Sequence, residues 1–454
     1  MDNRIIMFKD KEEAIRLTES EKIMTAGCAA GIAAAAIPTV YGYVKATAQK
    51  PIADADFLKT ENGGFVSDCG EYITLRGVNL NDDLFYFQKA DLDANSRSYD
   101  VFAALESRFG RYGARQLVQK FNEGMIAPSD IKYLRKLGAN CVRIPLRYRY
   151  LYSKENCKGD IDFDRLDFII EKCKKAGIYV ILDLHSAPGF QNNGSACSQS
   201  DRSVLFESSK EGFEARNAVV RLWTQVASHY KDEPAVAAYD LLNRPLHCVA
   251  DWENKLDTLH KFYRRIYKAI RHLDDRHIVI MQAPADADTL PSANDYPADN
   301  VAYGLYSHFR TTFETDALVN GIRALRDRKV PFVICKVRSE DNTDYSLTAL
   351  NDSGASWLFG DFKGSGNISN YLFSGNISPA DLTYDSYEEI GTKWSKPLST
   401  KNFTENKETA TILKGAFKYG NTLSLPENAK KGKLKVRVKF GFNVVKGINK
   451  PEQV

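Results

Sequence analysis

Short apolar runs alternate with longer amphipathic segments along most of the chain. The amphipathic segments place apolar residues at spacings of three and four, most clearly at 163–176, 217–230 and 251–271, and this spacing predicts helices. Strands that alternate with helices are typical of βα units and a parallel sheet. The apolar runs predict eight strands, at 73–80, 139–145, 178–184, 235–242, 277–281, 301–307, 331–335 and 355–361.

Eight such units close naturally into a (β/α)8 barrel, the TIM barrel of the α/β class. A hairpin-like segment at 65–79 starts the fold, and a long insertion at 81–125 follows the first strand. Long loops after the strands of such a barrel usually shape its site, so we expect the insertion to form one wall of it.

The pattern divides the chain into three parts. Residues 1–48 form a tail with a signal or anchor segment, 65–394 form the barrel, and 395–454 form a short C-terminal extension. The alternation weakens in the extension, where short runs at 422–425 and 434–442 leave two interpretations open. It is either a small β-appendage or a loose tail.

The N-terminal part contains an uncharged, Ala- and Gly-rich stretch at 23–44, flanked by Lys22 and Lys45. It is about as long as a membrane span. The small residues 46–48 fit a cleavage site, so a removed secretory signal and a retained signal-anchor are both compatible with the pattern. A soluble Ala-rich helix is the third interpretation. We expect an extracellular or cell-surface protein, secreted or held to the membrane through 23–44 if this segment is uncleaved.

Composition changes this picture little. Hydrophobic residues make up 43% and charged residues 26% of the chain, as in ordinary soluble globular proteins. The net charge is only +4, and the one basic cluster, 430–439, alternates basic with apolar residues like an exposed edge strand. We therefore predict no nucleic-acid partner. Metal-ligand spacings such as CxxC or HExxH do not occur in the sequence, and we predict no metal or cofactor.

The eight cysteines fall into different settings. Cys141, Cys173 and Cys335 lie in apolar strand or helix patterns and are predicted to be buried thiols. Cys157 and Cys197 lie in Gly/Asn/Ser-rich loops and could pair in an oxidising compartment, although sequence alone does not give the connectivity.

The catalytic groups of a (β/α)8 barrel lie at the C-terminal ends of its strands. Here the second strand carries Arg143, the third ends in His185, the fourth in Asn243-Arg244-Pro245, and the sixth in His308. In order and spacing these motifs resemble glycoside hydrolase family 5, the cellulase type. That family has Arg, His, Asn-Glu-Pro and His-x-Tyr at these ends, then Glu on the seventh strand and Trp on the eighth.

The segment 184–192 (LHSAPGFQN) is also similar to a loop of the exo-glucanase and cellulase-like branches, and the resemblance covers about 65–394. It implies a protein of the β-glucanase and cellulase lineage directed at polysaccharides or oligosaccharides. The substrate-binding positions that it implies are Arg143, His185, Asn243, His308, Arg310 and Gly360.

The departures from the family pattern are concentrated at the catalytic and sugar-binding positions. Arg244 occupies the acid/base position and Lys336 the nucleophile position, while Arg310 and Gly360 replace the tyrosine and the stacking tryptophan. Retaining glycosidases need two carboxyl groups about 5–5.5 Å apart. Arginine does not lose its proton at working pH, and lysine supplies no carboxylate. We therefore predict a catalytically inactive or strongly impaired protein.

Relocated catalysis is the alternative, an active retaining β-glycosidase that uses other carboxylates. Glu340 is the best placed of these, because it follows Lys336 by four residues. The other acids near the strand ends are Asp183, Asp240, Asp341 and Asp361.

The substitutions also leave an excess of positive charge. Arg143, Arg244, Arg310 and Lys336 are expected around one site with histidines at its edge. Two like charges about 4 Å apart cost about 4 kcal/mol at an effective dielectric constant of about 20. These side chains must therefore reach solvent, pair with acids such as Asp183, or bind an anion such as a uronic acid, a sulfated sugar or a phosphate. A non-enzymatic, anion-binding surface protein is thus a further hypothesis.

Overall fold

The computed structural model describes residues 50–80, 88–89, 98–152, 159–194, 203–291, 300–309, 311–324, 329–339, 342–365, 371–375, 379–418 and 422–423. The predicted signal or anchor at 23–44, the pairing of Cys157 with Cys197, and the basic cluster at 430–439 lie outside these residues. In the part of the chain that is described, the helices include none that is long and apolar enough to cross a membrane.

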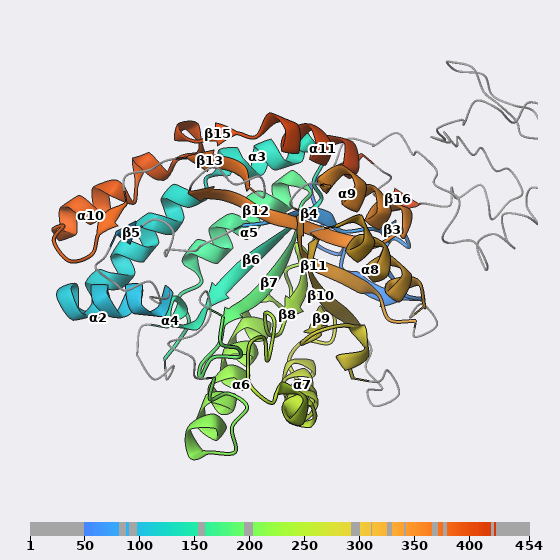
Figure 1. Cartoon of the computed structure of the whole chain (residues 1–454), viewed down its shortest axis with the longest axis horizontal. Helices are drawn as coiled ribbons and strands as arrows, with labels where there is room; N and C mark the ends of the chain where they lie inside the picture. Colours follow the sequence, from blue (N-terminus) through green and yellow to red (C-terminus); the bar gives the residue numbers. More distant parts are fainter. Residues whose placement is uncertain are drawn as a thin grey trace, which may run out of the picture. The chain divides into compact units, whose positions relative to one another are not determined.

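Eight parallel strands form a closed barrel in chain order, because β12 pairs with both β11 and β4 (Figure 1). This confirms the predicted (β/α)8 fold. The strands are β4 (Arg76–Asn79), β6 (Cys141–Arg147), β7 (Tyr179–Ser186), β8 (Val236–Asp240), β9 (Ile278–Gln282), β10 (Val301–Phe309), β11 (Phe332–Ser339) and β12 (Ser356–Ser365).

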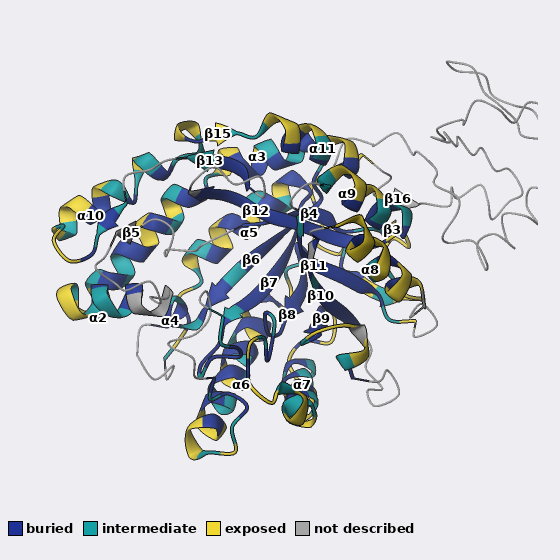
Figure 2. Cartoon of the chain, viewed as in Figure 1, coloured by how far each residue is buried: buried dark blue, intermediate teal, exposed yellow. Residues whose placement is uncertain are grey.

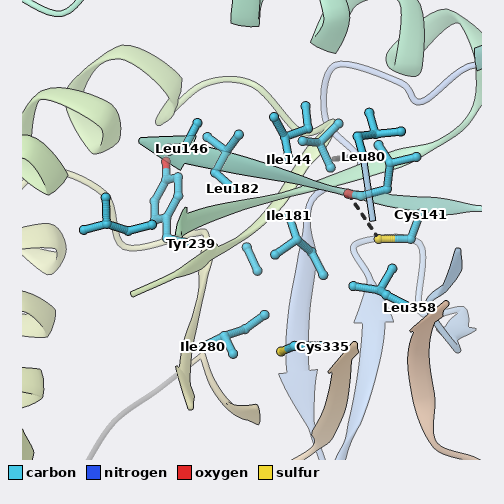
Figure 3. Close-up of a cluster of buried hydrophobic side chains, with 14 of the residues drawn as sticks. Leu80, Cys141, Ile144, Leu146, Ile181, Leu182, Tyr239, Ile280, Cys335 and Leu358 are labelled. Atoms are coloured by element: carbon cyan, nitrogen blue, oxygen red, sulfur yellow. Dashed lines mark hydrogen bonds between the residues drawn. The ribbon is translucent and has the colours of Figure 1, made fainter. Parts of the chain in front are cut away.

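The barrel strands are buried along most of their length, whereas the helices expose their outer faces (Figure 2). Apolar side chains from strands around the barrel, among them Ile144, Ile181, Ile280 and Leu358, gather in one cluster (Figure 3). Close packing also explains Gly77 in β4, where a Cβ atom would overlap the carbonyl oxygen of Cys141. The predicted buried thiols are confirmed, since the side chains of Cys141, Cys173 and Cys335 are fully buried.

Helices follow most of the strands and cover the outside of the barrel (Figure 1). Local signals set their ends: Gly177 ends α5 in the left-handed conformation, and the Ser209 side chain accepts a hydrogen bond from the Gly212 N–H at the start of α6. The helices are α3 (Pro128–Leu137), α4 (Tyr148–Leu151), α5 (Asp164–Ala176), α6 (Lys210–Tyr230), α7 (Leu256–Arg271), α8 (Thr312–Ala324) and α9 (Thr343–Asp352), with short 3-10 helices η2 (Trp252–Lys255) and η3 (Ala287–Thr289).

Most of the described residues of the insertion after the first strand are helical. Its described residues form β5 (Gln88–Lys89) and α2 (Ser98–Met125), and α2 is interrupted at Gly110, whose φ is 68°. α2 packs against α10 (Tyr387–Lys393), which follows the barrel in the chain (Figure 1). Arg108 of α2 also donates hydrogen bonds to two carbonyls of the segment before α10, those of Leu382 (2.5 Å) and Asp385 (2.8 Å).

The chain beyond α10 returns to the barrel. α11 (Lys407–Phe417) packs against α9 and α3, and its Phe417 stacks on Trp357 of β12 with ring centroids 5.4 Å apart. A small sheet of β1 (Leu58–Glu61), β2 (Gly64–Ser67), β3 (Tyr72–Ile73) and β16 (Thr422–Leu423) joins the two ends of the described fold. The remaining elements are β13 (Tyr371–Gly375), β14 (Ala380–Asp381), η5 (Lys396–Leu398), η6 (Thr400–Asn402) and β15 (Thr404–Glu405).

A buried lysine joins the end of β12 to this returning segment. The Lys363 ammonium donates hydrogen bonds to the Leu398 carbonyl (2.8 Å) and the Thr400 hydroxyl (2.9 Å). Burial lowers the pKa of Lys363 to about 8, although Asp130 partly opposes this shift. The folded protein therefore binds this proton less tightly than the unfolded chain does.

Stability should consequently rise with pH where the unfolded lysine is still protonated and the folded one is not. Between about pH 7.5 and about pH 10 we expect Lys363 to add about 2 kcal/mol to the free energy of unfolding. Lys363→Met should remove this rise in urea titrations at the two pH values, and Lys401→Met, at an exposed position nearby, should keep it. Equal pH dependence in both variants would contradict the assignment.

Candidate active site

Arg143 is the centre of a buried polar cluster near the carboxyl ends of the strands. Its side chain is 1% exposed. Nε donates to the Asp240 carboxylate (2.9 Å), and Nη2 lies 2.8 Å from the Asp183 carboxylate. The guanidinium also donates to the side-chain oxygens of Asn79 and Asn243, each at 3.1 Å. The fold thus brings together Arg143 and Asn243, which the sequence placed on different strands, and balances the arginine with carboxylates.

If both carboxyl groups are ionised, two carboxylates around one guanidinium leave one net negative charge in a buried cluster. Burial raises the pKa of Asp183 to about 6 and that of Asp240 to about 7, although Arg143 opposes both shifts. Asp183 adds to the shift of Asp240 by repulsion. The two aspartates raise the pKa of Arg143 beyond its usual range, against the effect of its burial. The arginine therefore stays charged, while Asp240 holds its proton more tightly than an ordinary aspartate.

His185 extends this cluster toward the surface. Its Nδ1 lies 2.6 Å from Asp183 Oδ2, and its Nε2 lies 3.5 Å from the Asn243 amide nitrogen. Asp183 and His185 are two residues apart on β7, so their side chains leave the same face of the strand. Asp183 thus orients the imidazole and also contacts the arginine.

The loop after β8 holds Arg244 in a backbone conformation that favours glycine, with φ at 46°. Neighbouring side chains fix this backbone. The Arg244 N–H donates to Gln282 Oε1 (3.0 Å), and its carbonyl accepts from Asn192 Nδ2 (2.9 Å). Gln191 donates to the Asn243 carbonyl (3.1 Å). The segment 184–192, which resembles a family loop, therefore holds the next loop in place.

The Arg244 side chain contacts rings. Its guanidinium carbon lies 4.0 Å from the centroid of the Tyr306 ring, and its Nη2 lies 2.7 Å from His247 Nε2. Burial and the charge of Arg244 lower the pKa of His247 to about 4, so the imidazole is neutral at pH 7. The Arg244 guanidinium thus lies over the Tyr306 ring and beside the uncharged imidazole of His247.

Lys336 pairs with an acid from the next strand. Its ammonium lies 2.6 Å from Asp361 Oδ1, and Arg338 reaches Asp361 Oδ2 at 2.5 Å. Burial alone would raise the pKa of Asp361, but the two cations outweigh it and lower the pKa to about 2. The register between β12 and β4 shifts between Phe359 and Asp361, so Gly360 lies at a β-bulge and Asp361 is the residue opposite Asn79.

Asp361 should make stability sensitive to acid. Because its folded pKa lies below the unfolded value of 3.8, its contribution is complete above about pH 4 and is lost as the pH falls toward 2. We expect a loss of about 2 kcal/mol over that range. Asp361→Asn should flatten this part of the pH profile in urea unfolding. Asp275→Asn, at an exposed carboxylate, is the matched control and should leave the profile unchanged.

Several predicted site residues cannot be placed. Arg310, Glu340 and Asp341 lie outside the described residues, and His308 is described only through its backbone in β10. Their roles stay predictions, as does the assignment of Arg244 and Lys336 to the two catalytic positions. Within the described ranges, His, Cys, Asp and Glu side chains form no group of three or more that could hold a metal ion.

Three residues of this region escaped the sequence analysis. Asn79 and Gln282 lie at the ends of β4 and β9, where Asn79 contacts Arg143 and Gln282 donates to Asp240 (2.7 Å). Arg338 shares Asp361 with Lys336. A polar residue that ends an apolar run was the available signal for Asn79 and Gln282. Arg338 carried no such signal, because it belongs to a run that was expected to end at residue 335.

Comparisons with known proteins agree with the fold. The family model "Cellulase (glycosyl hydrolase family 5)" matches residues 111–367, more than half of the chain. A beta-xylosidase of Phanerodontia chrysosporium is 28% identical over 256 residues, 56% of this chain and 52% of that protein. A glucan 1,3-beta-glucosidase of Pichia angusta is 26% identical over 323 residues, 66% of this chain and 67% of that protein. The chain thus spans about half the length of the first of these relatives.

Solved structures show the same architecture. An endogalactoceramidase aligns with a TM-score of 0.52 and 18% identity, covering 75% of this chain and 84% of that chain. A beta-glucanase of Saccharophagus degradans aligns with a TM-score of 0.50 and 14% identity, covering 82% and 97%. At these identities the likeness concerns the fold. Together with the match of the family model, it shows that this chain belongs to glycosyl hydrolase family 5.

Proposed function

We propose that this protein is a carbohydrate-directed member of the β-glucanase and cellulase lineage that hydrolyses glycosidic bonds weakly or not at all. The proposal rests on the sequence motifs: Arg244 lies between Asn243 and Pro245, and Lys336 follows the seventh predicted strand, where the resemblance predicts the two glutamates of the family. Neither side chain can act as a carboxylate in general acid catalysis or in attack on the anomeric carbon. The names of the relatives, a xylosidase and a glucosidase, support a saccharide as the ligand.

The neighbouring acids support the loss of hydrolysis. Asp183 and Asp240 are fully buried against Arg143, and Asp361 is buried between Lys336 and Arg338. A nucleophile must reach the anomeric carbon, and a general acid must reach the leaving oxygen. Carboxylates that are engaged by buried cations are poorly placed for either task.

The direct test pairs hydrolysis with binding. The full chain should release no product above buffer from aryl β-glucosides or β-glucans, and it should bind saccharides on a glycan array. Loss of both catalytic groups removes at least about 10⁴-fold in rate, so an active family member assayed in parallel sets a clear scale. Turnover that Glu340→Gln abolishes would overturn the proposal in favour of an active enzyme with relocated carboxylates.

The charge at Arg244 favours a finer proposal, that the ligand is anionic. Among the described residues, the contacts recorded for its guanidinium are the Tyr306 ring and the neutral His247, and neither carries negative charge. Lys336 and Arg338 share the single carboxylate of Asp361. An arginine fork is well suited to a carboxylate or a sulfate, so a uronic acid or a sulfated sugar fits this set of side chains.

Melting temperatures can test this ligand class. Glucuronic acid and sulfated oligosaccharides should raise the Tm more than their neutral counterparts, and Arg244→Met should remove the difference. Equal effects of charged and neutral sugars would contradict an anionic ligand. Stabilisation by sulfate alone, without affinity for any saccharide, would support the non-enzymatic anion-binding hypothesis. The cell-surface or secreted location rests on the 23–44 segment and stays part of the proposal.

A further inference from the structure

The loop after β8 contains a thiol, an imidazole and a guanidinium in direct contact. Cys248 Sγ lies 3.2 Å from His247 Nε2. Arg244 Nη2 lies 2.7 Å from the same nitrogen and 3.1 Å from Nδ1. Cys248 is exposed, whereas Arg244 and His247 are half-buried beneath it. Cys248 itself has no role in the proposed function.

His247 can form a hydrogen bond with the thiol in either tautomer. If Nε2 carries the lone pair, it accepts a hydrogen bond from the Cys248 S–H or from Arg244. If Nε2 carries the proton, it donates to the thiolate while Nδ1 accepts from Arg244. In both arrangements the guanidinium of Arg244 lies beside the imidazole, so the exposed sulfur has an electropositive neighbourhood of the kind in which reactive cysteines are found. Because His247 is neutral at pH 7, one of its ring nitrogens acts as a hydrogen-bond acceptor.

The backbone around this cluster is held in place. The Asn193 N–H donates to the His247 carbonyl (3.0 Å), and the Asn193 side chain donates to the Cys248 carbonyl (3.1 Å). These contacts keep the sulfur beside the imidazole and outside the core.

Cys69 is an internal comparison, because it is also exposed but has the opposite surroundings. Repulsion from Asp56, followed by burial and by the charges of Glu71 and Asp68, raises the pKa of Cys69. Neighbouring acids therefore disfavour the Cys69 thiolate, whereas the Cys248 sulfur contacts an imidazole that itself contacts a guanidinium.

We infer that Cys248, with His247 and Arg244, forms a reactive thiol site that takes up small-molecule disulfides and alkylating electrophiles. The thiolate attacks one sulfur of the disulfide, and a new S–S bond joins that sulfur to Cys248. The other sulfur leaves as a thiolate and takes a proton from solvent. An added thiol reverses the reaction. The inference is independent of the proposed function, since it needs neither hydrolysis nor a bound sugar.

Pulsed alkylation tests the site in the full chain. After a short exposure to iodoacetamide at about pH 7.5, peptide mass spectrometry compares the labelling of Cys248 and Cys69. We expect Cys248 to react about tenfold faster. His247→Phe and Arg244→Met should each remove most of this advantage, and Arg244→Met preserves a long side chain over Tyr306. His229→Phe, at the last turn of α6, should keep the advantage.

A second arm uses the disulfide itself. Incubation with glutathione disulfide should add one glutathione to the Cys248 peptide, and a reductant should remove it. Circular dichroism melts of each variant show whether it is folded, and if His247→Phe is not, Arg244→Met carries the comparison. Equal labelling of Cys248 and Cys69 would overturn the inference, as would unchanged labelling in folded variants. Recovery of Cys248 already cross-linked to another cysteine of the chain would do the same.

Discussion

The double exchange Arg244→Glu with Lys336→Glu should raise hydrolysis of aryl β-glucosides at least about 100-fold above the wild-type rate. It returns a carboxyl group to the end of β8 and another to β11, on a backbone that the neighbouring strands hold in place. The Arg244 N–H and carbonyl are fixed by Gln282 and Asn192, so a glutamate at 244 should take the same place in the loop. General acid catalysis and covalent attack then become possible together.

Neither single exchange should reach this rate. A general acid without a nucleophile, or the reverse, leaves one half of the mechanism missing, and catalytic groups that act as a unit are strongly non-additive. The rate should therefore appear only in the double variant, measured as kcat/KM with a chromogenic substrate.

The matched control is Arg244→Gln with Lys336→Gln, which removes the same two cations without supplying carboxylates. It should stay at the wild-type rate. Because Lys336→Glu places a second acid beside Asp361 with Arg338 as the remaining cation, the melting temperature of each variant must be measured. A folded double variant with no gain in rate would contradict the assignment of the two positions.

Arg143→Met should cost about 3–5 kcal/mol of stability in urea unfolding at neutral pH. The side chain is 1% exposed and holds the carboxylates of Asp183 and Asp240, which are fully buried. Methionine fills a similar volume but leaves both acids without the cation that offsets their burial. They must then take up protons or admit water, and either response weakens the native state.

Asp240→Asn should have a much smaller effect on stability than Arg143→Met. It removes one charge from the same cluster but leaves Arg143 with a counter-ion. Arg143 keeps Asp183 as its counter-ion, so we expect a loss of less than about 1 kcal/mol at pH 8. The folded pKa of Asp240, about 7, lies above the unfolded value of 3.8, so this carboxyl destabilises the wild type increasingly as the pH rises from 4 to 7. The stability of the variant relative to the wild type should therefore improve over that interval. A loss as large as that of Arg143→Met would refute the charge argument.

Hydrophobic pattern predicted the barrel well, because each strand is a short apolar run between recognisable helices. The ends of those runs also predicted Arg143, His185 and Asn243 as site residues, since a parallel barrel gathers its strand ends on one side. The structure brings these three side chains into contact. The partners of Arg143 were partly foreseen, as Asp183 was among the acids expected to balance it.

The sequence pattern did not predict the ion pair that Lys336 forms. Its pairing with Asp361 depends on the bulge at Gly360, which shifts the register of β12 by one residue, and periodicity alone does not locate bulges. The position of α11 was equally hidden. Its pairing of Phe417 with Trp357 joins residues 60 positions apart, and local pattern carries no information about such a contact.

The two loops after β7 and β8 suggest how such a site can change its chemistry while the barrel persists. Residue 244 is held through its main chain, by Gln282 on one side and Asn192 on the other, so its placement does not depend on which side chain it bears. We therefore expect substitutions at residue 244 to have little effect on the surrounding fold. Exchanges at residue 244 can therefore change the chemistry of the site while the barrel persists, although hydrolysis also requires the matching change at Lys336.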